Sequence, residues 1–241
     1  MSLSSATPSS PSGSTDPAAP DAPPEPDAPA ESDPAPEPDA PVAQPQPRHR
    51  QLSLFGVEAV EPSPADLAGL LIGPAELVRM GGTARISVLV DAAWRVHVLV
   101  AELARRGVPA NWAGEVRQAH AVRTPYTTAL APLAASWLRD TAKQPPPNFF
   151  LTGPRLRLWT AAAGSPDPLG FVLRLGESDE GCWAAAGAAL AAIGLPAVLL
   201  DAGAGGPAYR ITGRRRLARL AELVGERPGA APPTGWPAPP S

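Results

Sequence analysis

The 241-residue sequence predicts an α+β protein built as a pseudo-symmetric tandem, in which two units of the order helix, two strands, helix, two strands, helix follow an unfolded tail. Three observations lead to this prediction. Residues 1–47 have the composition of a disordered segment, residues 227–241 are rich in proline and are also expected to be disordered, and the sequence between them repeats the same succession of short motifs. We expect the first unit at residues 65–141 and the second at residues 153–226.

The tail, residues 1–47, holds 14 of the 34 prolines and eight of the 23 acidic residues, without one Lys or Arg. Such a segment cannot bury enough apolar surface to offset its ordering entropy, so we predict that it is disordered. Residues 48–241 then carry 15 acids against 20 bases. This excess of positive charge favours an anionic partner, and the acidic tail could mask the basic part in cis.

Cysteine content and hydropathy exclude several protein classes. The single Cys182 leaves no intramolecular disulfide and no Cys-based zinc site, which is typical of a reducing compartment. The first residues show no secretory signal, so we expect the protein in the cytoplasm. The uncharged stretch 181–200 is interrupted by Gly194 and Pro196 and therefore predicts a helix followed by a strand, not a membrane span.

A short apolar peptide, Gln51-Leu52-Ser53-Leu54-Phe55, follows the tail in a linker that we place at residues 48–64. Large apolar side chains in a flexible segment usually await a partner. All five residues resemble the peptide by which bacterial DNA polymerases and mismatch-repair proteins bind the β sliding clamp of DNA polymerase III. The resemblance implies that Gln51 makes polar contacts and that the leucines and Phe55 fill a hydrophobic pocket. The alternative is a peptide that docks onto its own domain.

The repeat rests on four matches in one order, with offsets of 87 to 91 residues. The matched pairs are residues 67–73 with 158–164, Trp94 with Trp183, residues 103–110 with 190–197, and residues 130–134 with 217–221.

Each unit is expected to contain the same elements. A short apolar helix ends at Gly73 or Gly164, an alternating strand follows, and a longer helix stops at Gly107 or Gly194. One or two further strands precede the last helix. The expected strands are 84–90 and 170–175, the longer helices 94–106 and 182–193, the glycine-rich turn 201–207, and the last helices 127–139 and 214–224. Four tryptophans on these helices are expected in the core (Trp94, Trp137, Trp159 and Trp183), Trp112 is undecided, and Trp236 is expected to be exposed.

The order of elements, headed by Leu67-Ala-Gly-Leu-Leu-Ile-Gly73, resembles the LAGLIDADG homing endonucleases over about residues 65–226. The resemblance implies that the two heading helices pack together and that two sheets bind duplex DNA. The second unit is also similar to the WhiA family of sporulation regulators, which use this fold to bind DNA. A nucleoid-associated protein is therefore expected.

Homing endonucleases carry an acid at the end of each heading helix, where carboxylates hold Mg²⁺ for phosphodiester cleavage. In this sequence Pro74 and Ser165 fall on those positions. The sequence therefore predicts no catalytic residue, no metal site, no cofactor and no enzymatic activity. A register shifted by two residues would use Glu76 and Asp167 instead. His97 and His120 have no partner at the spacing of metal ligands.

Arginines occur at paired places on the predicted strands, on the faces opposite the alternating apolar residues. Phosphate contacts or bidentate contacts to guanine would use such side chains. Arg214, Arg215 and Arg216 begin a helix, where cations oppose the helix dipole, so a phosphate partner would explain them. The competing interpretation is a solvated sheet face. The predicted DNA-binding residues are Arg85, Arg123, Arg174, Arg210, Arg214, Arg215 and Arg216.

We therefore expect a non-catalytic accessory protein of DNA replication or repair, which binds the β sliding clamp through residues 51–55 and DNA through a LAGLIDADG-like domain. Three alternatives stay open: a WhiA-like transcription regulator, an active Mg²⁺-dependent endonuclease, and an adaptor that holds other repair proteins.

Overall fold

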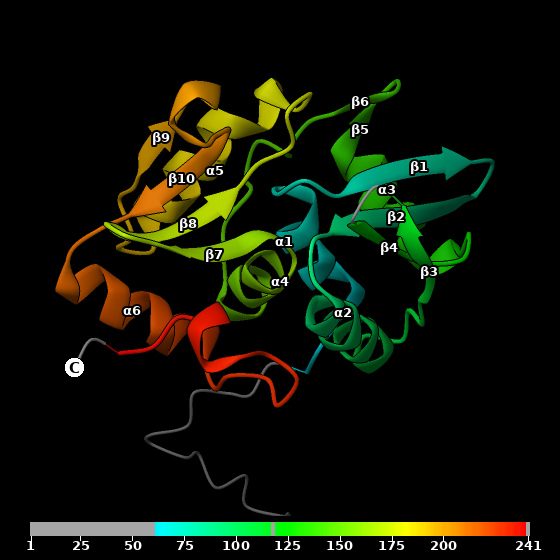
Figure 1. Ribbon diagram of the computed structural model, residues 1–241. Coiled ribbons are helices and arrows are strands. Elements are labelled where there is room, and N and C mark those ends of the chain that lie inside the picture. Colours follow the sequence, from blue (N-terminus) through cyan, green and yellow to red (C-terminus); the bar gives the residue numbers. More distant parts are fainter. Residues whose placement is uncertain (1–60, 117–118, 240–241) are drawn as a thin grey trace, which may run out of the picture. The chain divides into compact units, whose positions relative to one another are not determined.

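The computed structural model describes residues 61–116 and 119–239, so the peptide at residues 51–55 lies outside the described part of the chain. The described residues belong to one compact unit. Its first half contains a 3-10 turn (Pro64–Leu67), α1 (Ala68–Leu71), β1 (Glu76–Met80), β2 (Thr83–Val90), α2 (Ala93–Arg105), β3 (Asn111–Val116), β4 (Ala119–Arg123), α3 (Ala131–Trp137) and a small hairpin of β5 (Leu138–Arg139) and β6 (Ala142–Lys143) (Figure 1).

The second half repeats this order. It contains α4 (Gly153–Ala163), β7 (Gly164–Asp167), β8 (Gly170–Arg174), α5 (Glu180–Ala192), β9 (Val198–Leu200), β10 (Ala208–Ile211) and α6 (Arg214–Val224). The first sheet has the strand order β1-β2-β4-β3 and the second sheet the order β7-β8-β10-β9, both antiparallel. The predicted tandem of two αββαββα units is thereby confirmed.

Local sequence explains where the long helices end and which way the strands face. Gly107 and Gly194 follow α2 and α5 with φ of +70° and +82°, a left-handed conformation that glycine adopts without strain. On β2 the residues Ile86, Val88 and Val90 are buried, because alternate side chains of a strand point to one face.

The two halves meet where α1 packs against α4, at the centre of Figure 1. Gly69 permits this contact, since a Cβ at that position would lie 1.9 Å from the backbone oxygen of Arg155. Further along, a Cβ at Gly73 would lie 2.6 Å from the ring of Trp159. The two helices therefore run in the same direction, and one continuous hydrophobic core includes residues of both halves.

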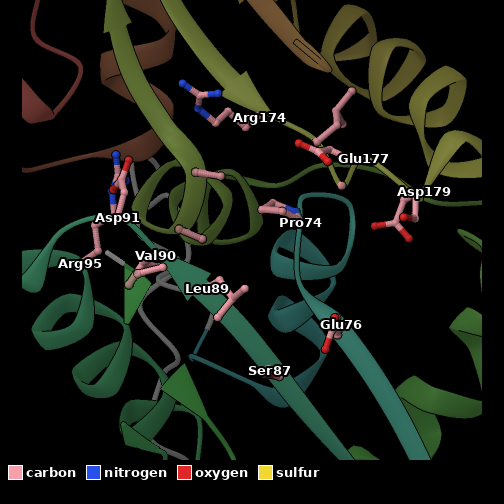
Figure 2. A pocket seen from close by; sticks show the side chains of 16 residues that line it. Pro74, Glu76, Ser87, Leu89, Val90, Asp91, Arg95, Arg174, Glu177 and Asp179 are labelled. Atoms are coloured by element: carbon pink, nitrogen blue, oxygen red, sulfur yellow. The ribbon is translucent and has the colours of Figure 1, made fainter. Parts of the chain in front are cut away.

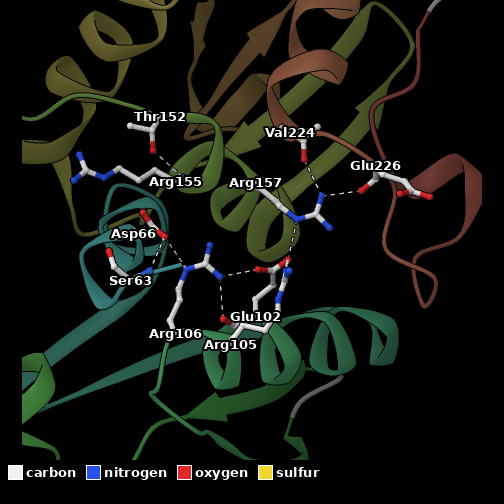
Figure 3. A network of polar contacts seen from close by, with 10 residues as sticks. All are labelled: Ser63, Asp66, Glu102, Arg105, Arg106, Thr152, Arg155, Arg157, Val224 and Glu226. Atoms are coloured by element: carbon white, nitrogen blue, oxygen red, sulfur yellow. Dashed lines mark hydrogen bonds and ion pairs between the residues drawn. The ribbon is translucent and has the colours of Figure 1, made fainter. Parts of the chain in front are cut away.

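A buried charge network joins the halves near the first residues of these helices (Figure 3). Glu102 of α2 is 3% exposed and pairs with Arg157 of α4 at 2.8 Å and with Arg106 at 2.7 Å. Arg105 also pairs with Glu102, and Arg106 reaches Asp66 at 3.2 Å. Burial raises the pKa of Glu102, but hydrogen bonds from Arg157 and Arg106 outweigh this effect and leave that pKa below its ordinary value.

Two expectations about the last part of each unit are wrong. Trp236 is 4% exposed, and its indole nitrogen donates to the backbone oxygen of Gly225 at 3.2 Å. The guanidinium of Arg157 lies over its ring, 5.1 Å from the ring centroid. Trp236 and Ala231 therefore anchor the segment after the last helix to the core, whereas most of its other described residues are exposed. The helix expected at residues 127–139 is shorter, since the backbone turns into β5 at Leu138.

The uncharged stretch 181–200 forms α5 and β9, as predicted. None of the helices in the described residues is long and apolar enough to cross a membrane. Of the tryptophans expected in the core, Trp137 and Trp159 are fully buried, whereas Trp94 and Trp183 are half-buried against it. Trp112 is 56% exposed and contacts His120 edge-to-face.

Candidate functional site

Each sheet presents one face to the core and one face away from it, which we call the outer face. On β2, Arg85, Ser87 and Leu89 alternate with the core residues Ile86, Val88 and Val90 and lie on the outer face of the first sheet, where Ser87 is buried. Leu89 is 60% exposed. On the second sheet, Arg174 and Arg210 alternate with Leu173 and Tyr209 of the core. The outer faces are therefore the surfaces that the sequence predicted to carry arginines.

A pocket of about 640 Å³ lies where the two halves meet, which we call the central pocket (Figure 2). It is lined from the first half by Pro74, Glu76, Ser87, Leu89, Val90, Asp91, Arg95 and Ala119, and from the second half by Ala162, Ala163 and residues 174–179. Outer-face residues of β2 and β8 are thus continuous with this pocket. The last residues of α1 and α4 lie beside it.

A buried cation binds backbone oxygens at or just after the end of each of these helices. Arg95 of α2 donates to the backbone oxygens of Ala161 at 2.9 Å and Gly164 at 2.5 Å, at the end of α4. Lys143 of β6 donates to those of Gly73 at 2.9 Å and Ala75 at 2.7 Å, after α1. The partial negative charge of a helix end favours a cation there. Each of the two helix ends is therefore stabilised by a side chain from outside that helix.

Carboxylates of the central pocket divide into paired and unpaired ones. Asp91 pairs with Arg95 at 2.8 Å, and Asp179 pairs with Lys143 at 2.6 Å. Burial lowers the pKa of Arg95, and the neighbouring Asp91 offsets part of this effect. Glu76 and Glu177 are exposed and form no ion pair with any residue that the structure describes.

Within residues 61–116 and 119–239, no three His, Cys, Asp or Glu side chains lie close enough together to hold a metal ion. Asp167, which the shifted register pairs with Glu76, lies at the turn between β7 and β8 and does not line the central pocket. The shifted register therefore brings only Glu76 to the pocket.

The predicted arginines occupy different surroundings. Arg174 is exposed and lines the central pocket, Arg123 donates to the hydroxyl of Ser87 at 3.3 Å, and Arg85 lies over the ring of Tyr126. Arg210 pairs with Asp167 at 3.0 Å. Arg214, Arg215 and Arg216 are exposed at the first turn of α6, which follows β10, and do not line the central pocket. The structure thus places the strand arginines on the outer faces but sets the α6 group apart from the pocket.

Sequence reasoning missed four residues of this region: Arg95, Lys143, Glu177 and Tyr126. Arg95 follows Trp94 at the first turn of a predicted helix, so nothing local indicated that it would be buried. Lys143 lies between the two predicted units and reaches the residues after α1 from 68 residues away or more. Tyr126 was missed because the arginine over its ring, Arg85, lies on a strand far away in the sequence.

Neither a scan against protein-family models nor a search of curated proteins finds a match. Among solved structures, the chain is similar to the homing endonuclease I-WcaI bound to its DNA recognition sequence, at 13% identity and a TM-score of 0.49, covering 66% of this chain and 78% of that one. It is also similar to I-DmoI in complex with DNA and Mn, at 12% identity and a TM-score of 0.40, covering 68% of this chain and 96% of that one.

This finding corrects the prediction that the chain is not an enzyme. Both similar structures are homing endonucleases, which are enzymes. The prediction was made from two positions, Pro74 and Ser165, that lack a carboxylate. The fold places other carboxylates, those of Glu76 and Glu177, in the central pocket. The side chains at the two aligned positions therefore do not decide whether this chain catalyses a reaction.

Proposed function

We propose that the chain binds duplex DNA on its two outer sheet faces, across the central pocket. The observation that carries this proposal is the position of Arg85, Arg123 and Arg174, on outer faces that meet at one pocket. Three guanidinium groups on a surface continuous over two sheets can neutralise successive phosphates, which supplies most of the affinity of proteins for DNA at moderate salt.

The chemistry of the outer faces suits a nucleic acid better than a small ligand. The exposed Arg123 is held by the buried hydroxyl of Ser87, and Leu89 and Met80 expose apolar side chains on the same face. Hydroxyl and guanidinium groups bind phosphate oxygens and base edges, whereas apolar groups contact thymine methyls. A continuous surface of this kind spans more than one base pair.

We also propose a second partner, the β sliding clamp, bound through Gln51-Leu52-Ser53-Leu54-Phe55. The support for this partner is the sequence alone, since these residues lie outside the described part of the chain. A clamp that encircles DNA would hold the domain at a high effective concentration beside its substrate. The outer faces then need only weak affinity. On this basis we propose a role in DNA replication or repair.

DNA binding is tested by fluorescence polarisation of a labelled duplex with the full chain over a salt series. We expect an affinity that falls steeply with salt, and a large loss on combining Arg85→Ala, Arg123→Ala and Arg174→Ala. A matched control replaces exposed arginines away from the outer faces, Arg139 and Arg227, with Ala. Binding that the triple variant retains in full would refute the DNA-binding part of the proposal.

Clamp binding is tested separately by calorimetry with purified β clamp. We expect the full chain to bind and the Leu54→Ala, Phe55→Ala variant to lose binding, because the two apolar anchors carry the contact. Ser53→Asp is the matched control, since the motif accepts either residue there. Absence of clamp binding by the unaltered chain would refute the clamp as a partner and would favour a transcription regulator that binds duplex DNA alone.

A second candidate function, cleavage of the bound DNA, is favoured by Glu76 and Glu177 in the central pocket. Nicking of a supercoiled plasmid by the full chain, with and without Mg²⁺, tests it. Glu76→Gln should abolish nicking, whereas Asp167→Asn should not, because Asp167 lies outside the pocket. Nicking that is unaffected by Glu76→Gln would show that the activity does not come from this site.

A further inference from the structure

We infer that the two outer faces hold DNA unequally. In this inference the first sheet and Arg174 supply the phosphate contacts, Tyr126 is the positioning residue of Arg85, and Asp167 withholds Arg210 from phosphate. The inference rests on the proposed DNA binding and extends it, since it assigns roles to two residues, Tyr126 and Asp167, that the sequence did not place at the interface.

The positive charge of Arg210 is offset by Asp167, a residue of the same sheet. Its Nε lies 3.0 Å from Oδ1 of Asp167 without a hydrogen bond to it, and its Nη2 donates to Oδ2 at 3.1 Å, so the two side chains form an ion pair with one hydrogen bond. The backbone N–H of Leu169 also donates to Oδ1, at 3.0 Å, which fixes the carboxylate in the β7–β8 turn. The two side chains are 21% and 16% exposed. A phosphate would have to displace a carboxylate that is already paired with this arginine and held by a backbone N–H.

The positive charge of Arg85 is not offset by its ring partner, because the side chain of Tyr126 is neutral. The guanidinium carbon lies 4.8 Å from the centroid of the Tyr126 ring. Stacking fixes the plane of the guanidinium and leaves the terminal N–H groups at its edge for an oxygen ligand. The Nε is buried without a hydrogen-bond partner among the described residues. A side chain held in this way loses less entropy when it binds a phosphate.

The position of Tyr126 is itself fixed by β2. The neighbouring Thr127 forms two backbone hydrogen bonds with Ala84, of 2.9 and 3.1 Å, which tie the loop after β4 to the strand that carries Arg85. Ring and guanidinium therefore belong to one rigid part of the first sheet. We therefore assign Tyr126 the role of positioning Arg85, and not that of contacting DNA by itself.

The other two outer-face arginines resemble Arg85 in keeping their charge. Arg123 has a neutral partner, the hydroxyl of Ser87 at 3.3 Å. The side chain of Arg174 is exposed and makes no hydrogen bond or ion pair within the described residues. Three of the four arginines thus carry a net positive charge to the surface, and the fourth does not.

The test measures how steeply duplex affinity falls with salt for single variants of the full chain, over about 50 to 300 mM salt. Arg85→Ala, Arg123→Ala and Arg174→Ala should each lower the slope of log affinity against log salt by about one. Arg210→Ala should leave the slope unchanged. Asp167→Asn should raise it by about one and raise the affinity about threefold, because it frees Arg210.

Two outcomes are distinguishable. If Arg210→Ala lowers the slope of log affinity against log salt as much as Arg85→Ala does, the inference is overturned, although DNA binding itself still holds. Absence of any salt-dependent binding by the unaltered chain would instead refute the proposed function.

The role of Tyr126 is tested by Tyr126→Leu, with Tyr126→Phe as the matched control that keeps the ring. We expect Tyr126→Leu to lower the slope and Tyr126→Phe to preserve it. In the Arg85→Ala background, Tyr126→Leu should have no further effect, because a positioning residue acts only through its partner. An equal loss in both backgrounds would overturn this role. Circular dichroism and thermal melting of each variant show whether the fold is kept.

Discussion

Gly69 of α1 faces the backbone oxygen of Arg155 in α4 so closely that a Cβ there would lie 1.9 Å from that oxygen. The two backbones form the joint between the halves, and therefore set how the two outer faces meet. Neither partner can yield by rotating a side chain, since the opposing atom belongs to a helix backbone.

Replacing Gly69 with Ala should therefore destabilise the protein strongly, by about 3 kcal/mol, because the helices must separate to admit a methyl group. Gly82→Ala is the matched control: a Cβ at that position would meet no atom within 4 Å, so a change of less than about 0.5 kcal/mol is expected. Urea denaturation measures both. Equal stability of the two variants would show that the helix joint is not tightly packed.

The network around Glu102 makes a second prediction. Glu102→Gln should cost about 3 kcal/mol at pH 7, because it removes the carboxylate that Arg105, Arg106 and Arg157 share, and only Arg106 keeps another one, that of Asp66. The pKa of Glu102 is lowered in the folded protein, so its contribution is present above the ordinary pKa and is lost as the pH falls through the lowered one.

Denaturation at several pH values checks this prediction. The stability difference between the unaltered chain and Glu102→Gln should be largest at neutral pH and shrink in acid. Glu222→Gln, which alters an exposed pair with Arg219, is the control and should have little effect at any pH. A Glu102→Gln difference that does not depend on pH would contradict the assignment of an ionised carboxylate.

The packed segment after α6 predicts that Trp236 contributes to stability. Trp236→Ala should cost about 3 kcal/mol, because it removes a buried ring and its hydrogen bond to Gly225. Trp112→Ala, at a tryptophan that is 56% exposed, should cost less than about 1 kcal/mol. Thermal melting compares them, and similar melting temperatures would show that the segment adds nothing to the fold.

These residues also show what could be predicted from the sequence. Glycines after α2 and α5, alternation on β2 and β8, and the repeated motifs indicated the element order, because each depends on neighbours within a few residues. Trp236 was assigned wrongly because a single ring in a proline-rich segment leaves no periodic pattern. The contacts of Arg95 and Lys143 at the helix ends were missed because the backbone oxygens that accept there carry no sequence signature. The pairing of Arg210 with Asp167 depends on strand register, which alternation alone does not determine.

Cys182 gives a prediction at alkaline pH. Burial raises the pKa of its thiol to about 11, so the folded state favours the neutral thiol. Stability from this preference is complete below about pH 9 and is lost as the pH rises toward 11, by up to about 2 to 3 kcal/mol. The free energy of unfolding, measured from about pH 7 to 11 for the unaltered chain and Cys182→Ala, should show a difference that shrinks above about pH 9. A constant difference would contradict a buried neutral thiol.

The claim that DNA lies on the outer faces is tested most directly by thiol protection, for which the slowly reacting Cys182 gives a low background. Leu89→Cys places a thiol on the outer face at the central pocket, and Ala188→Cys places one on the exposed side of α5. Labelling with a maleimide is followed with and without saturating duplex DNA at low salt. We expect DNA to slow labelling at position 89 severalfold and to leave position 188 unchanged. Protection at position 188 alone, or at neither position although DNA is bound, would contradict the claim.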